Sequence, residues 1–132
     1  MTDKQTLASY RIIQAEETLS EAEILQKGNA SPRSVINRAY YCMFYAVLSL
    51  FLHSDINPRT SKHGRVIGVF DKEFVHTGKI EKKYSVALHD MFDKRLGADY
   101  KDFAEVSREE AEEGIRLARE FLHALKLYME KG

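Results

Sequence analysis

Hydrophobic residues recur along most of the chain at the spacing of a helical face, and no stretch alternates in the manner of a β-strand. The first such segment ends near the Gly28-Asn29 pair, a helix-stop signal. Its apolar stripe consists of Ala8, Ile12, Ala15, Leu19 and Ala22. We therefore predict an all-α protein whose first element is a long amphipathic helix.

The second segment is the most apolar part of the sequence. Ser31 can cap its start, and Pro32 fits the first helical position, where its missing N–H costs nothing. Residues 40–52 are apolar nearly all round, which predicts a helix at the centre of a bundle. The apolar run 39–52 is shorter than the roughly 20 residues that cross a bilayer, so we interpret it as a core helix.

Three further helices complete the predicted fold. We expect the third at residues 61–76, with a stop at Thr77-Gly78, and the fourth at residues 79–96, ended by Gly97. The last opens at Ser107, where Glu110 three residues later forms a capping box. Its stripe consists of Ala111, Ile115, Ala118, Leu122, Leu125 and Met129. The short connections favour antiparallel neighbours, so residues 1–132 are predicted to form one up-and-down bundle of about five helices.

Composition narrows the possible functions. The 132 residues include 20 Lys and Arg and 20 Asp and Glu, which excludes the global basic field of a protein that coats nucleic acid. Contact with a nucleotide or RNA would therefore need a local site. The single cysteine, Cys42, excludes an internal disulfide and favours a reducing, cytoplasmic setting, with the thiol buried and inert.

Arg38 is the first candidate for such a site, because it is a permanent charge within the most apolar segment. Helical spacing places it on one face with Tyr41. One interpretation is a buried ion pair with Asp99 or Asp90 as the acceptor. The other is a phosphate or nucleotide site, since the guanidinium fork suits phosphate.

Two further groups of residues could bind anions. Arg95 continues the apolar stripe of the fourth helix, so it either caps that helix or forms a site with Asp99 and Tyr100, which follow it. Lys62 and His63 fall in the first turn of the third helix, where backbone N–H groups attract anions or are simply solvated. The sequence contains no recognisable cofactor motif and no metal-ligand spacing.

The blocks SVINRAYYCMFY, KHGRVIGVFDKEFVHTGKI, RLGADY and SREEA, in this order, resemble the HEPN domain family of small prokaryotic proteins. They span most of the chain between residues 31 and 121. The resemblance implies an up-and-down helical bundle that usually forms homodimers. It also implies frequent pairing with a separately encoded minimal nucleotidyltransferase in toxin–antitoxin or related stress and defence systems.

Many HEPN proteins are metal-independent ribonucleases with an arginine, four to six intervening residues and a histidine. The matching positions here resemble that motif at Arg95, but Tyr100 stands where the histidine is expected, and Leu96 replaces a common polar residue. A phenol with a pKa near 10 is a poor base at neutral pH beside an imidazole with a pKa near 6.5. His63 would have to approach from another helix to supply that group.

Three functions stay open at this stage. The first is a non-catalytic or weakly catalytic homodimer that binds a nucleotide or RNA and partners a minimal nucleotidyltransferase. The second is a metal-independent endoribonuclease, with Arg95, His63 and Tyr100 as the catalytic candidates. The third is a structural dimeric interaction module. The expected binding residues are Arg38, Tyr41, Lys62, His63, Arg95, Asp99 and Tyr100, and Tyr100 is also a candidate for nucleotidylation by the partner.

These hypotheses depend on two spatial expectations. The guanidinium groups of Arg38 and Arg95 must meet near the corner formed by Asp99 and Tyr100. The homodimer rests on the second and last helices, whose apolar surface exceeds what one small bundle needs to bury. We expect no cofactor, no metal and no membrane partner.

Overall fold

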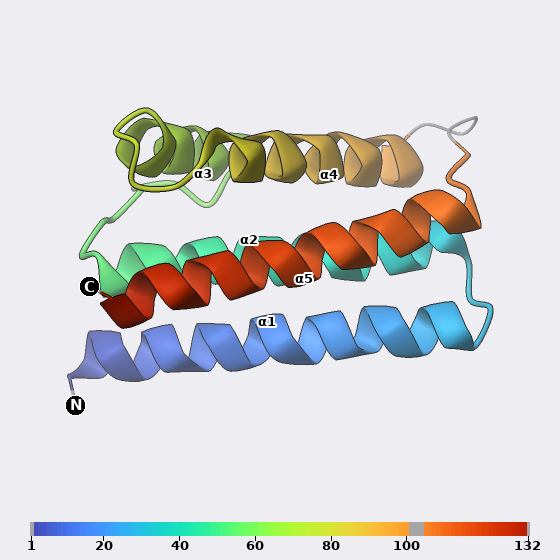
Figure 1. Cartoon of the computed structure of the whole chain (residues 1–132), viewed down its shortest axis with the longest axis horizontal. Helices are drawn as coiled ribbons and strands as arrows, with labels where there is room; N and C mark the ends of the chain where they lie inside the picture. Colours follow the sequence, from blue (N-terminus) through green and yellow to red (C-terminus); the bar gives the residue numbers. More distant parts are fainter. Residues whose placement is uncertain (1, 101–104, 132) are drawn as a thin grey trace.

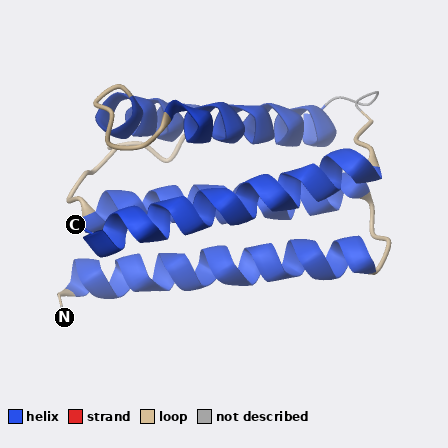
Figure 2. Ribbon diagram, in the orientation of Figure 1, coloured by secondary structure: helices blue, strands red, loops and turns tan. Residues whose placement is uncertain are grey.

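The computed structural model describes residues 2–100 and 105–131, except for the side chains of residues 98–100. Its elements are α1 (Asp3–Lys27), α2 (Pro32–His53), α3 (His63–Phe70), the π-helical turn η1 (Asp71–Val75), α4 (Lys82–Tyr100) and α5 (Arg108–Lys131). The four long helices run alternately in opposite directions (Figure 1). No strand occurs in the described residues (Figure 2). The predicted all-α, up-and-down bundle is confirmed.

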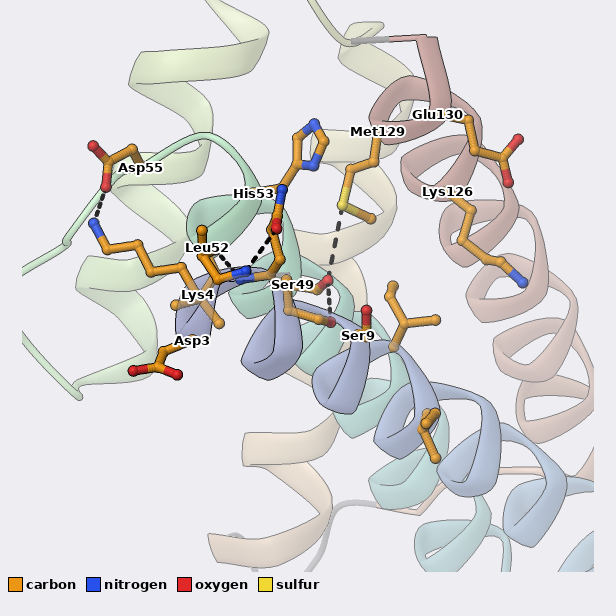
Figure 3. A pocket seen from close by; sticks show the side chains of 15 residues that line it. Asp3, Lys4, Ser9, Ser49, Leu52, His53, Asp55, Lys126, Met129 and Glu130 are labelled. Atoms are coloured by element: carbon orange, nitrogen blue, oxygen red, sulfur yellow. Dashed lines mark hydrogen bonds and ion pairs between the residues drawn. The ribbon is translucent and has the colours of Figure 1, made fainter.

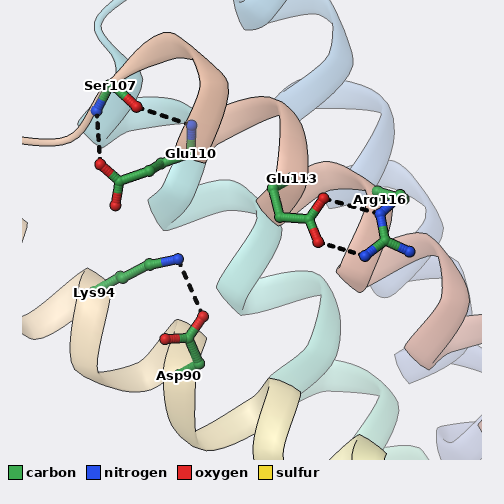
Figure 4. Close-up of polar contacts among 6 residues, drawn as sticks. All are labelled: Asp90, Lys94, Ser107, Glu110, Glu113 and Arg116. Atoms are coloured by element: carbon green, nitrogen blue, oxygen red, sulfur yellow. Dashed lines mark hydrogen bonds and ion pairs between the residues drawn. The ribbon is translucent and has the colours of Figure 1, made fainter.

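Local signals start the helices where the sequence predicted. The Ser31 hydroxyl accepts a hydrogen bond from the backbone N–H of Ser34, with Pro32 at the first helical position of α2. At the start of α5, the Glu110 N–H donates to the Ser107 hydroxyl, and the Ser107 N–H donates to the Glu110 carboxylate (Figure 4). These contacts satisfy backbone donors that have no partner within the helix.

Helix α2 forms the centre of the core and packs against α1, α4 and α5. By length and composition alone it could cross a membrane, but 67% of its apolar window is buried inside the bundle. Its buried apolar side chains are Val35, Ile36, Ala39, Tyr40, Cys42, Met43, Phe44, Ala46, Val47, Leu50 and Phe51. Helix α2 meets three other helices, but one stripe along it, formed by Tyr41, Tyr45, Leu48 and Leu52, is only partly buried. Part of the apolar surface that we expected on α2 therefore stays accessible, and the homodimer stays a prediction.

The third and fourth helices differ from their predicted extents, and the difference in the fourth affects the site. The expected third helix is divided into α3 and η1, and the chain then turns at Gly78, whose φ is +77°. Gly97 does not end the fourth helix, because α4 continues to Tyr100. A glycine inside a helix costs only about 1 kcal/mol, which surrounding interactions can outweigh. Arg95 consequently lies inside α4 and not at its end.

Candidate functional site

His63 is the residue around which the candidate site is built. It is the first residue of α3, and its half-buried ring stacks on Phe44 of α2, with centroids 3.9 Å apart and planes 14° apart. The Tyr40 hydroxyl, one helical turn before Phe44, lies 2.8 Å from the Nδ1 atom of His63. The start of α3 is thus joined to α2 by one polar contact and one stacked ring.

Arg95 brings α4 to the same place. Its Nη1 atom lies 3.5 Å from Nδ1 of His63. Its guanidinium carbon lies 5.2 Å from the centroid of the Tyr40 ring and 5.3 Å from that of Tyr41. A guanidinium at these distances is attracted to the ring faces. The expectation that Arg95 projects toward the bundle is therefore met, and its position lets it contact residues of two other helices.

Arg38 joins the site from the other direction along α2. Its guanidinium carbon lies 5.5 Å from the centroid of Tyr41, so Arg38 and Arg95 both contact this ring. Its nitrogen atoms contact Glu21 of α1 at 3.5 Å and Asn37 at 2.9 Å. Both guanidinium groups thus lie against the Tyr41 ring.

The expectation that Arg38 is buried is wrong, and one of its two proposed acceptors pairs with another residue. The Arg38 side chain is 36% exposed, because it lies at the surface of the bundle and not in its core. The carboxylate of Asp90, one of the two proposed acceptors, lies 3.1 Å from Lys94 one turn along α4 (Figure 4). The other proposed acceptor, Asp99, has a side chain outside the described residues.

The remaining predicted residues contribute less to the described site. Lys62 is exposed and stands immediately before α3, where its side chain makes no capping hydrogen bond. Tyr100, like Asp99, belongs to α4, but its side chain also lies outside the described residues. The expected corner of Asp99 and Tyr100 therefore falls beyond the side chains that the structure describes.

Sequence reasoning missed Tyr40, Phe44 and Phe92 as site residues. Phe92 of α4 packs against Tyr40 with ring centroids 5.8 Å apart. Tyr40 and Phe44 belong to the apolar run of residues 40–52, which predicts a core position, and Phe92 carries no signal of its own. The available signal was Tyr40 itself, because a phenol in an apolar helix usually finds a polar partner when it is buried.

The environment of the site shifts two pKa values. Burial raises the pKa of Tyr40, and the charge and hydrogen bonding of Arg95 only partly oppose this. Burial, followed by the nearby positive charge of Arg95, lowers the pKa of His63 below its ordinary value. At neutral pH the site therefore combines a protonated phenol, a neutral imidazole and a guanidinium. Such a set suits an anionic ligand, and the neutral imidazole is also able to take up a proton.

A second hollow lies at the opposite end of α2 from Arg38, and it competes with this site as a candidate. A wide pocket of about 1290 Å³ opens between the start of α1 and the ends of α2 and α5 (Figure 3). Lys4 pairs with Asp55 there, and the Ser49 hydroxyl donates to the backbone oxygen of Ala8 at 2.7 Å. Its lining carries charges of both signs, and Lys126 pairs with Glu16 outside the lining, so the charges indicate no class of ligand.

Comparison with known proteins identifies a matching domain family and several similar proteins. The HEPN domain model matches residues 8–128. A UPF0332 protein of Thermotoga maritima is 35% identical over 130 residues, which cover 98% of this chain and 96% of the relative. Two proteins of Methanocaldococcus jannaschii, each named "putative toxin", are 34% and 38% identical, over 89% and 85% of this chain and 78% and 81% of their own lengths.

Proposed function

This chain belongs to the HEPN domain family, and on that premise we propose that it is a toxin-like protein that binds the phosphate of a nucleotide or RNA at the site formed by His63 and Arg95. The observation that carries the proposal is the convergence of Arg95, His63 and Tyr40 from three separate helices. The two relatives named as toxins support the toxin-like role.

The chemistry of the site favours phosphate over an uncharged ligand. A guanidinium offers parallel N–H donors that match phosphate oxygens, and it keeps its charge at every physiological pH. Arg38 lies on the same Tyr41 ring as Arg95 and is partly exposed, so it can add a second cationic contact. The aromatic surroundings lower the local dielectric, which strengthens attraction to an anion.

Binding can be measured by calorimetry with two probes, AMP and a short mixed-sequence RNA. We expect Arg95→Ala to weaken binding of either probe roughly 10- to 100-fold, as for loss of a charged hydrogen-bond donor. Arg119→Ala is the matched control, because Arg119 pairs with Glu23 on the face shared by α1 and α5. Wild-type protein that gives no heat with either probe at millimolar concentration would refute the proposal.

The partner and the assembly are further parts of the proposal. We propose a homodimer that associates with a minimal nucleotidyltransferase in a toxin–antitoxin or related defence system, on the strength of the family resemblance. Light scattering of the chain at micromolar concentration should give twice 15.2 kDa. A nucleotidyltransferase encoded beside this gene should then raise that mass when added. A monomer whose mass does not change when the nucleotidyltransferase is added would contradict both the homodimer and the association.

One observation favours a second function, metal-independent RNA cleavage. His63 lies 3.5 Å from Arg95, so in this function α3 would supply the histidine that Tyr100 replaces. Arg95 would stabilise the phosphoryl charge, and His63 would act as the general acid or base. RNA incubated with the protein and a chelator tests this: cleavage should disappear in Arg95→Ala and His63→Ala and persist in Arg119→Ala. If the RNA stays intact with the wild-type protein, cleavage is rejected as a function, and the proposal of phosphate binding still stands.

A further inference from the structure

The Tyr40 hydroxyl forms a hydrogen bond with one ring nitrogen of His63, and this contact determines which nitrogen carries the proton. Tyr40 has no exposed surface, and its hydroxyl lies 2.8 Å from His63 Nδ1. Its ring is also held from other sides, by Phe92 at 5.8 Å and by the guanidinium of Arg95 at 5.2 Å. These contacts hold the ring, and with it the hydroxyl oxygen, in place beside Nδ1 of His63.

The direction of this hydrogen bond follows from the other groups at the site. Burial raises the pKa of Tyr40, so the phenol keeps its proton and is able to donate it. Arg95 can only donate, and its Nη1 atom also faces Nδ1 of His63 at 3.5 Å. A proton on Nδ1 would face this guanidinium and would leave the Tyr40 proton without its acceptor. Nδ1 is thus the acceptor, and the ring proton belongs on Nε2.

We propose that Tyr40 is a positioning residue that holds His63 as the neutral tautomer protonated on Nε2, so that His63 meets a phosphate as a hydrogen-bond donor beside Arg95. The tautomer follows from the contacts of a protonated phenol and a guanidinium with Nδ1, whereas the ligand rests on the proposed function. The stacked ring of Phe44, 3.9 Å away, fixes the plane of the imidazole and so the direction of the Nε2–H bond.

This arrangement favours binding over cleavage. A histidine that acts as a base through Nε2 needs a lone pair on that nitrogen. In this site the proton would first have to move to Nδ1, and the Tyr40 hydroxyl would have to rotate from donor to acceptor. The ligand-free site is therefore prepared to donate two kinds of hydrogen bond to an anion, one from His63 and one from Arg95.

The tautomer can be read directly from the ¹⁵N chemical shifts of His63 in the full-length, ligand-free protein at neutral pH. We expect Nε2 at the shift of a protonated nitrogen and Nδ1 at that of an unprotonated nitrogen that accepts a hydrogen bond. In Tyr40→Phe, Nδ1 should move toward the value of a free lone pair. The pKa of His63 should rise by roughly half to one unit, because a donor that stabilises the neutral ring is gone.

Tyr45→Phe is the matched control, since Tyr45 lies on the same helix, loses the same hydroxyl and has its ring against Tyr41. It should leave the shifts and the pKa of His63 unchanged. A proton on Nδ1 in the wild-type protein would overturn the proposal, even if Tyr40→Phe failed to fold. So would a Tyr40→Phe spectrum with the wild-type tautomer and the wild-type pKa.

Titration with inorganic phosphate separates this inference from the proposed function. We expect phosphate to shift the Nε2 resonance of the wild-type protein and to bind several-fold more weakly to Tyr40→Phe. If the ligand-free tautomer is as stated but phosphate leaves Nε2 unmoved, the role of Tyr40 in fixing the ring stands and phosphate binding at this site is refuted.

Discussion

At the scale of single residues, Cys42 shows how strongly burial controls chemistry in this protein. Its side chain has no exposed surface, and burial raises the pKa of the thiol to about 12, with Glu16 and Glu23 adding to the rise. Only the thiolate reacts with disulfide reagents. We expect native protein at pH 8 to react with such a reagent at least a hundredfold more slowly than protein unfolded in guanidinium. Rapid stoichiometric labelling of the native chain would contradict a buried, inert thiol.

His63 gives the stability of the protein a pH dependence. Its pKa is lowered in the folded state, so between that value and about 6.5 the unfolded chain binds a proton that the folded chain does not. The free energy of unfolding should therefore be fully developed above about pH 6.5 and should fall as the pH drops through the folded-state pKa. Urea unfolding at a series of pH values measures this.

The variant His63→Gln removes the titrating group, so its stability should fall less steeply over the same range of pH. His123→Gln, which changes an exposed histidine on α5, should keep the wild-type slope. The comparison concerns slopes and not absolute stability, because His63→Gln also loses the contacts with Tyr40 and Phe44. Equal slopes for all three proteins would mean that His63 titrates alike in both states.

Single residues also mark the limit of what the sequence could reveal about the site. Arg38, Tyr41, His63 and Arg95 were predicted because charge and ring chemistry are visible in the sequence. The ion pair of Arg38 and the role of Tyr40 were not, because these partners come from other helices: Glu21 lies 17 positions from Arg38, and His63 lies 23 positions from Tyr40. Periodicity assigns a residue to a helix face but does not identify the side chain that it meets.

At the scale of elements, two glycines should respond in opposite ways to alanine. Gly68 is exposed on α3, and a Cβ there would have no atom within 4 Å. Gly68→Ala should raise the free energy of unfolding by about 0.5–1 kcal/mol through helix propensity. A Cβ on Gly114 of α5 would lie 3.0 Å from side-chain atoms of both Ile36 and Met91. Both neighbours are fully buried, so overpacking should make Gly114→Ala a net loss of about 1 kcal/mol.

Chemical denaturation of the two variants checks this pair, with unchanged helix content by circular dichroism as the control. Stabilisation of Gly114→Ala by as much as Gly68→Ala would show that Met91 and Ile36 move aside without cost. Loss of stability in Gly68→Ala would mean that helix propensity does not govern α3.

Element boundaries were predictable where the signal is local. Ser31 and Ser107 each cap a helix through atoms within three residues, so their sequence pattern was sufficient. Gly97 was misleading because a stop signal is only a preference, and α4 passes through it. The π-helical turn of residues 71–75 also has no periodic signature of its own. Its Asp71 accepts hydrogen bonds from Ser85 at 2.6 Å and from His89 at 2.6 Å, contacts that only tertiary structure provides.

At the scale of the whole molecule, the site joins long, well-packed helices to a short helix that is not stable by itself. The long helices α1, α2 and α5 pack directly on one another. Helix α3 has only eight residues, fewer than the roughly 12–15 at which an isolated helix becomes marginally stable. It is retained by Val66, Ile67 and Phe70 in the core and by His63 at the site. A ligand at the site would therefore stabilise α3, the helix that depends most on its tertiary contacts.

Hydrogen exchange should expose this difference. We expect amides of α3 to exchange through local opening, at a lower free energy than amides of α2, which open only when the core unfolds. His63→Ala removes the contacts with Tyr40 and Phe44, so it should speed exchange in α3 while exchange in α2 changes little. His123→Ala on α5 should leave both unchanged. Equal protection of α3 and α2 in the wild-type protein would mean that the bundle opens as one unit, and binding at His63 could then stabilise α3 only together with the whole fold.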